Sequence, residues 1–143
     1  MLVPKKVKHR KWQSARKHIT KISSSDARGA KISFGSFGLK ALSSARVKSN
    51  QIESARKAMS RKITKVGKIW IRIFPDRPIT SKPPEVAMGS GKGDLQAYCF
   101  EVKPGRIIFE VDGVDEATAR EALRKAGTKL PVKTKIVSRA ETQ

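Results

Sequence analysis

Positive charge is concentrated in the first half of the chain, and this constrains the protein more than any other feature of its sequence. Residues 1–75 hold 20 lysines and arginines against two acids, Asp26 and Glu53, whereas residues 76–143 hold 12 basic and 10 acidic residues. A compact domain with a net charge of +20 repels itself and requires a polyanion to screen it. Nucleic acid and an anionic membrane surface are the two candidates.

The sequence lacks the features that the membrane alternative would need. It contains no basic amphipathic helix with a large apolar face, no lipidation signal and no apolar run long enough to span a bilayer. No apolar segment of the kind found in a secretory signal follows the basic residues near the N-terminus. We therefore predict a nucleic-acid partner and no membrane partner.

Residues 1–30 have the composition of a basic arm. Within them, residues 1–25 contain eight lysines and arginines, two histidines and no acid, with few apolar side chains to bury. Such a segment is expected to be disordered alone and to become ordered along a phosphate backbone, where each cation displaces counterions. The alternative is a solvated tail without a function. Trp12 is expected to pack against the domain, and stacking on a base is the alternative.

Residues 31–143 are predicted to form a single α/β domain, a two-layer sandwich in which two helices cover a mixed or antiparallel sheet. The predicted strands begin near Lys31 and cover residues 68–74, 95–102, 106–112 and 132–139. Pro104 and Gly105 suit the centre of a type II turn, so the strands at 95–102 and 106–112 are expected to form a hairpin. Gly35 and Gly38 favour a twisted strand with a tight turn; a close phosphate approach is the alternative.

The first predicted helix covers residues 50–66, with Asn50 as its N-cap and Glu53 as the capping-box partner. Gly67 is expected to end it in a left-handed conformation. Its buried face is predicted to consist of Ile52, Ala55, Met59, Ile63 and Val66. The opposite face is strongly basic, which favours RNA contact over an ordinary solvated surface.

The second helix is predicted to begin after Asp115 and to end at Gly127. Its inward residues are expected to be Ala119, Ala122, Leu123 and Ala126. Between the two helices, residues 76–93 show no periodicity and contain prolines followed by the glycine-rich stretch 88–93, which indicates a long functional loop. Lys92 lies between two glycines in this loop, where no bulky neighbour is expected to screen it.

The sequence gives little support for catalysis or metal binding. A single cysteine and two histidines do not make a zinc site, and His9 and His18 both lie in the arm. Cys99 is expected to be a buried structural thiol. Aromatic residues make up only 6% of the chain, which argues against large stacking platforms. We predict no enzyme activity, no cofactor, no metal and no small-molecule substrate.

Several collinear segments carry a family resemblance. They are MLVPKKVKHRKW at 1–12, SFGSFGLKA at 33–41, QIESARKAM at 51–59, GKIWIRIFPD at 67–76, MGSGKG at 88–93 and KPGR at 103–106. Together these segments span nearly the whole chain and resemble the bacterial-type L16 family of large-subunit ribosomal proteins. Ala87 departs from this pattern, because many bacterial members have an arginine there that can be hydroxylated. The stretch 19–28 also looks longer than the usual spacer.

The resemblance implies a structural constituent of the large ribosomal subunit, in the cytoplasm or in a plastid stroma. Such proteins bind large-subunit rRNA near the central protuberance, shape the aminoacyl-tRNA site, contact tRNA and neighbouring ribosomal proteins, and support late subunit assembly. A free-standing nucleic-acid chaperone or regulator is the alternative. The residues expected to bind rRNA are Lys5, Lys6, Lys8, Arg10, Lys11, Arg16, Lys17, Lys40, Arg46, Arg56, Lys57, Arg61 and Lys65. The loop expected near tRNA contains Met88, Gly89, Ser90, Gly91, Lys92 and Gly93.

Overall fold

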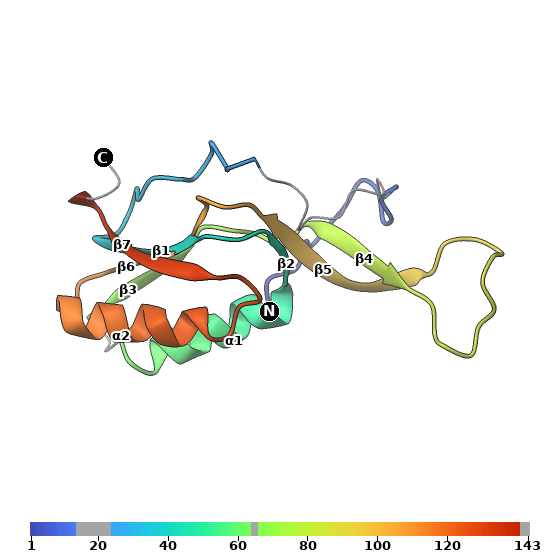
Figure 1. Ribbon diagram of the computed structural model, residues 1–143. Helices are drawn as coiled ribbons and strands as arrows, with labels where there is room; N and C mark the ends of the chain where they lie inside the picture. The colour runs from blue at the N-terminus through green and yellow to red at the C-terminus, as the bar shows by residue number, and fades with distance from the viewer. Residues whose placement is uncertain (14–23, 64–65, 141–143) are drawn as a thin grey trace.

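A computed structural model describes residues 1–13, 24–63 and 66–140 (Figure 1). Within these ranges the elements follow the order β-β-α-β-β-β-β-α-β, which adds two strands to the predicted order. They are β1 (Phe37–Ala41), β2 (Ala45–Lys48), α1 (Ser49–Ser60), β3 (Lys68–Ile71), β4 (Arg77–Ser81), β5 (Asp94–Val102), β6 (Ile107–Asp112), α2 (Glu116–Gly127) and β7 (Thr134–Ser138).

The strands form two antiparallel sheets. Sheet A has the order β3-β6-β1-β7 and sheet B the order β2-β5-β4. The helices lie side by side against one face of sheet A, so the predicted two-layer α/β architecture is confirmed (Figure 1). Between the layers, the side chains of Leu39, Phe109, Met59 and Leu123 have no exposed surface.

The other face of sheet A is covered by the segment that leads into β1, which crosses it in Figure 1. Ile32 from this segment forms a small buried cluster with Ile107 of β6 and Val137 of β7. The strand predicted from Lys31 therefore begins only at Phe37, because residues 31–36 lie across the sheet instead of pairing within it.

The turn at Pro104 and Gly105 forms as predicted, but the hairpin does not. Gly105 has a φ of 93°, and the Arg106 N–H donates to the Lys103 carbonyl at 3.3 Å. Strand β5 then pairs with β2 and β4, whereas β6 pairs with β1 and β3. The chain thus passes from sheet B to sheet A at this turn, because each strand finds its partners elsewhere in the sequence.

Helix α1 is shorter than predicted and has a different cap. Lys48 is its N-cap, and the Gln51 side chain accepts a hydrogen bond from the Lys48 N–H at 2.9 Å. The expectation of an Asn50–Glu53 capping box is therefore wrong. Four residues of the predicted buried face are buried, but Val66 lies beyond the helix and is 77% exposed.

Helix α2 matches its prediction closely, with Asp115 accepting from the Thr118 N–H at 3.0 Å and all four predicted apolar residues buried. The helix ends at Gly127 as predicted, whereas the left-handed conformation predicted for Gly67 is wrong, since its φ is not positive. A Cβ on Gly67 would lie 2.1 Å from Ile63, and one on Gly127 would lie 2.6 Å from Thr134. Close packing therefore requires both glycines.

The predicted loop at 76–93 contains a strand, β4, so the prediction is wrong over residues 77–81. The prolines in and around this segment are atypical of strands, so the sequence pattern did not indicate β4. Strand β4 lies at the edge of sheet B, where Pro78 can be accommodated because an edge strand leaves half of its N–H groups unpaired. Together β4 and β5 form a two-stranded ribbon that extends beyond the helices, with residues 82–93 at its tip (Figure 1).

Candidate nucleic-acid interface

The tip of the ribbon is an open turn. Gly89, Ser90 and Gly91 have φ angles of 95°, 53° and 98°, and Met88 is 93% exposed. Apart from the glycine itself and its two chain neighbours, no heavy atom of the described residues lies within 4 Å of the place that a Cβ on Gly89 or Gly91 would occupy. The glycine-rich sequence thus produces a projecting backbone that a large partner can approach closely.

The N-terminal arm is attached to the protein at two places. Near its start, Leu2 packs against the main core and its carbonyl accepts a hydrogen bond from the Ser49 hydroxyl at 2.7 Å. At its other end, the Lys11 ammonium donates to the Asp94 carboxylate at 3.3 Å and to the Lys92 carbonyl at 3.2 Å. The arm is therefore held to the domain near residues 2 and 11, in contrast to the expected disorder, while residues 5–10 between these contacts are exposed.

The contacts of Trp12 join the arm to the loop. The Lys92 ammonium donates to the Trp12 carbonyl, and the Arg77 guanidinium lies 5.9 Å from the centre of the Trp12 ring. Trp12 thus packs against the ribbon, as expected. Lys92 is exposed, as expected, and its ammonium also connects the loop to the arm.

The predicted rRNA-binding residues fall into several groups. Lys5, Lys6, Lys8 and Arg10 are exposed along the arm, and no ion pair involves them within the described residues. Lys40 is half-buried in β1, opposite Lys135 of β7. The predictions for Arg16, Lys17 and Lys65 lie outside the described residues.

The basic face of α1 is partly neutralised. Glu53 forms ion pairs with Arg56 at 2.7 Å and with Lys57 at 4.0 Å, and the Arg56 bond holds the pKa of Glu53 below its ordinary value. Arg46 of β2 likewise pairs with Glu101 at 3.1 Å. Arg61 is exposed and makes no such pair within the part of the chain described here. Its charge is therefore not offset by an acid among these residues.

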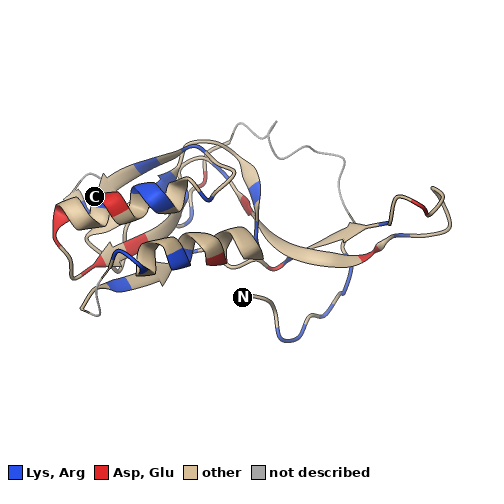
Figure 2. Cartoon of the chain, turned by 90° about the horizontal axis from the view of Figure 1, so that it is seen from below, with Lys and Arg blue, Asp and Glu red and all other residues tan. Residues whose placement is uncertain are grey.

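Acidic and basic residues are interspersed over the helices, whereas the N-terminal segment shows basic residues alone (Figure 2). On α2, for example, Arg120 pairs with Glu116 at 2.6 Å and Lys125 with Glu121 at 2.9 Å. Ion pairs of this kind offset part of the charge on the helices. Residues 1–13, in contrast, hold five lysines and arginines and no acid.

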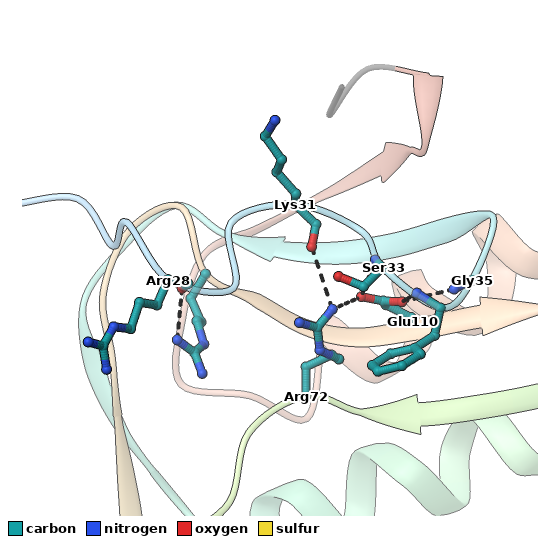
Figure 3. Close-up of polar contacts among 8 residues, drawn as sticks. Arg28, Lys31, Ser33, Gly35, Arg72 and Glu110 are labelled. Carbon is teal, nitrogen blue, oxygen red and sulfur yellow. Dashed lines mark hydrogen bonds and ion pairs between the residues drawn. The ribbon is translucent and has the colours of Figure 1, made fainter.

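Sequence reasoning did not identify one charged site, at Glu110. This carboxylate is fully buried in β6, where it accepts hydrogen bonds from the N–H groups of Ser33, Phe34 and Gly35 at 3.1, 2.7 and 2.9 Å (Figure 3). Its side chain also pairs with Arg72. Burial alone would raise the pKa of Glu110, but these donors outweigh it and hold the pKa below its ordinary value.

The Glu110 site bears on the alternative raised for Gly35, a close approach of phosphate to the backbone. The backbone near this glycine does bind an anion, but that anion is the protein's own carboxylate. A Cβ on Gly35 would also lie 2.6 Å from the Val111 carbonyl, so the close approach to β6 requires glycine. One sequence signal could have revealed the site: Glu110 interrupts the otherwise apolar run Ile107–Val111 and needs a buried partner.

The structure also bears on the cysteine, on metal ligands and on membrane helices. Cys99 is a buried free thiol whose pKa is raised by burial, as expected for a structural cysteine. The described ranges contain no group of three residues that could hold a metal ion. They also contain no helix with the length and apolar character needed to cross a membrane.

These features define a basic α+β protein with exposed cations along an arm and a projecting two-stranded ribbon. The family model described as "Ribosomal protein L16p/L10e" matches residues 4–137, and the chain belongs to this family of structural ribosomal proteins. It is 51% identical over 139 residues to "Large ribosomal subunit protein uL16" of Halorhodospira halophila, covering 97% of this chain and 98% of the relative. The protein of the same name from Afipia carboxidovorans is 52% identical over 139 residues, with the same coverage of both chains.

Proposed function

We propose that the protein is a structural constituent of the large ribosomal subunit that binds its rRNA near the central protuberance. In this proposal it shapes the aminoacyl-tRNA site, contacts tRNA and neighbouring ribosomal proteins, and supports late assembly of the subunit in the cytoplasm. Support comes from the family membership and from relatives that bear the name of a large-subunit protein.

The observation that carries the rRNA-binding proposal is the attachment of the arm. Lys5, Lys6 and Lys8 are exposed, and the contacts of Leu2 and Lys11 hold the chain on either side of them. Fixing the backbone in advance lowers the entropy cost of placing these cations on a phosphate lattice. Each phosphate that they neutralise releases counterions, so the binding is expected to depend strongly on salt.

The loop at the ribbon tip is the part proposed to lie near tRNA. It extends away from the helices and has a backbone that a phosphate can approach, because Gly89 and Gly91 carry no side chains (Figure 1). Lys82 and Lys92 supply positive charge at its two ends. The Lys82 ammonium donates to the Gly89 carbonyl, which helps to hold the turn in shape.

The test compares two triple variants that remove the same charge. In Lys5→Ala/Lys6→Ala/Lys8→Ala the arm loses three cations, and in Arg124→Ala/Lys129→Ala/Lys133→Ala three exposed cations are lost elsewhere. Affinity for large-subunit rRNA is measured over a range of salt concentrations. The arm variant is expected to reduce the slope of log K against log salt by about 2, and the control by much less. Equal slopes would contradict the proposed role of the arm.

Sedimentation separates the ribosomal function from that of a free-standing nucleic-acid chaperone. A ribosomal constituent is expected to migrate with large subunits through gradients that contain enough salt to remove loosely bound basic proteins. A chaperone is expected to remain at the top of such gradients, because its RNA contacts are mainly electrostatic.

A further inference from the structure

An aromatic pair, one residue exposed and the other half-buried, lies on the face of sheet A that the helices do not cover. Phe34 is 56% exposed, and its ring stacks on that of Trp70 with a centroid distance of 6.2 Å and an angle of 18° between the planes. The Arg72 guanidinium lies 5.1 Å from the centre of the Phe34 ring. We propose that Phe34, Trp70 and Arg72 form a binding site for an unpaired base of RNA. We call these three residues the aromatic platform.

The platform is held in place by the buried carboxylate of Glu110. The Phe34 N–H donates to one oxygen of Glu110 at 2.7 Å, and Arg72 pairs with the other oxygen. Trp70 lies directly opposite Glu110 in the pairing of β3 with β6. One buried anion thus fixes the backbone under the Phe34 ring and the cation beside it. A site prepared in this way loses little conformational entropy when a base stacks on it.

The charge around the platform favours RNA over an apolar partner. Lys31 and Lys68 are exposed nearby in sequence, at the two segments that supply the rings. The acids in this region are partnered: the Glu110 carboxylate pairs with Arg72, and the Asp112 carboxylate accepts a hydrogen bond from the Ser36 hydroxyl. A base flanked by phosphates matches this combination of aromatic surface and cations, because it offers a π face and negative charge together.

Phe34 presents an aromatic surface that a partner can cover. Burial of this side chain would add stability, yet the residue is 56% exposed in the protein alone. The proposal rests on the proposed rRNA-binding function and adds to it a site for single-stranded or bulged RNA. Base stacking on such aromatic side chains is tolerant of sequence, so adenine-rich RNA provides a suitable probe.

The test uses Trp70 as its own reporter. The chain contains two tryptophans, so Trp12→Phe leaves Trp70 as the only one. The probes are an oligoadenylate RNA of about 12 nucleotides, enough for several stacked bases, and an abasic oligomer of the same length. Stacking is expected to quench Trp70 fluorescence with the oligoadenylate and not with the abasic oligomer. Equal quenching by both, or none by either, would overturn the proposal.

Substitutions at the platform provide the second measurement. Phe34→Leu keeps the backbone N–H that binds Glu110 and is expected to lower oligoadenylate affinity about 5- to 100-fold, without changing affinity for the abasic oligomer. Phe34→Tyr is expected to preserve binding. Phe74→Leu, which changes another exposed phenylalanine, is the matched control and is expected to have no effect. Circular dichroism verifies that each variant is folded.

The outcomes for the platform and for the proposed function can be distinguished. If Phe34→Leu binds oligoadenylate normally while the arm variant still loses rRNA affinity, the proposal that the platform binds a base is wrong. The rRNA-binding proposal then stands. If Phe34→Leu binds all RNA normally but enters large subunits poorly, the surface contacts a protein, which also overturns the platform. Loss of oligoadenylate affinity together with loss of Trp70 quenching supports the platform whatever the arm does.

Discussion

The guanidinium of Arg72 pairs with the carboxylate of Glu110, and through this contact a cation near the end of β3 is joined to the only acid whose side chain is fully buried among the described residues. The same carboxylate accepts hydrogen bonds from three successive N–H groups in the segment that crosses sheet A. A single side chain thereby connects β3, β6 and the segment before β1. We expect the position of this segment to depend on the charge of Glu110.

Replacing Glu110 by glutamine tests this dependence. Glu110→Gln preserves the size of the side chain but removes its charge, and its amide group cannot accept all the hydrogen bonds that the carboxylate accepts. We expect the free energy of unfolding near pH 7 to fall by about 3 kcal/mol, as when one partner of a buried ion pair is lost. Urea denaturation measures this change. Glu116→Gln, which breaks the exposed pair with Arg120, is the control and is expected to have little effect.

The same pair predicts how stability depends on pH. The folded-state pKa of Glu110 lies below its ordinary value of 4.5, so its contribution is present above that value and is lost as the pH falls through the folded pKa. The difference in unfolding free energy between the wild type and Glu110→Gln is therefore expected to shrink below about pH 4.5. A difference that stays constant down to about pH 3 would contradict the lowered pKa.

Met59→Ala tests the assignment of the buried face of α1. Met59 has no exposed surface and lies in the core between the helices and sheet A, so its truncation leaves a cavity. We expect a loss of about 2–5 kcal/mol in unfolding free energy, measured by urea denaturation. Met88→Ala makes the same chemical change at a residue that is 93% exposed, and its stability should match that of the wild type. Similar losses in the two variants would show that Met59 is not a core residue.

Arg61 and Arg56 provide a matched pair on the basic face of α1. Arg61 is exposed without an ion pair in the described residues, whereas the charge of Arg56 is offset by Glu53. Arg61→Ala is expected to weaken binding of large-subunit rRNA about two- to fivefold and to reduce the salt slope by slightly less than 1. Arg56→Ala should change the slope less. Filter binding at several salt concentrations measures both, and the reverse order would assign the RNA contact to Arg56.

Lys92→Ala tests the loop at the ribbon tip. In the protein alone the Lys92 ammonium donates to the Trp12 carbonyl. To bind a phosphate, it must therefore break this hydrogen bond and form a new one. We expect the variant to assemble into large subunits but to bind aminoacyl-tRNA a fewfold more weakly, as for one solvated phosphate contact of up to about 1 kcal/mol. Measurements on purified ribosomes determine affinity and accommodation rate.

Two control variants separate tRNA contact from attachment of the arm. Lys92→Arg retains the charge and is expected to preserve tRNA affinity. Trp12→Ala removes the ring that lies under Arg77 but leaves the Trp12 carbonyl in place, so the Lys92 contact can persist. If Lys92→Ala binds tRNA as the wild type does, the loop has no tRNA role through this residue.

The arm is better tested by point substitutions than by truncation. Leu2 packs against the main core, and its carbonyl binds the Ser49 hydroxyl at the start of α1. Deleting the first residues would remove these contacts together with the cations. Composition alone indicated a segment with little to bury, and it could not reveal that one leucine and one carbonyl connect the arm to the domain.

Local patterns in the sequence determined much of the secondary structure. Asp115 is followed by a well-spaced apolar face, so α2 was predicted nearly to the residue. The turn at Gly105 was also predicted, because a positive φ at that position depends on neighbouring residues alone. The excess of basic residues over acids in the first half likewise indicated a polyanionic partner, because net charge follows from composition and does not depend on how the chain folds.

The tertiary structure decided which segments meet. Strands β5 and β6 follow one another at a tight turn but join different sheets, because strand pairing is determined by partners far away in the sequence. Gly67 and Gly127 are needed for side chains that pack against them, which local conformation does not reveal. Lys92 contacts Trp12, and Phe34 contacts Trp70 and Glu110, only because the fold brings distant segments together. Charge and periodicity are properties of the chain itself, whereas the contacts that hold the loop, the arm and the aromatic platform exist only once the sheets have formed.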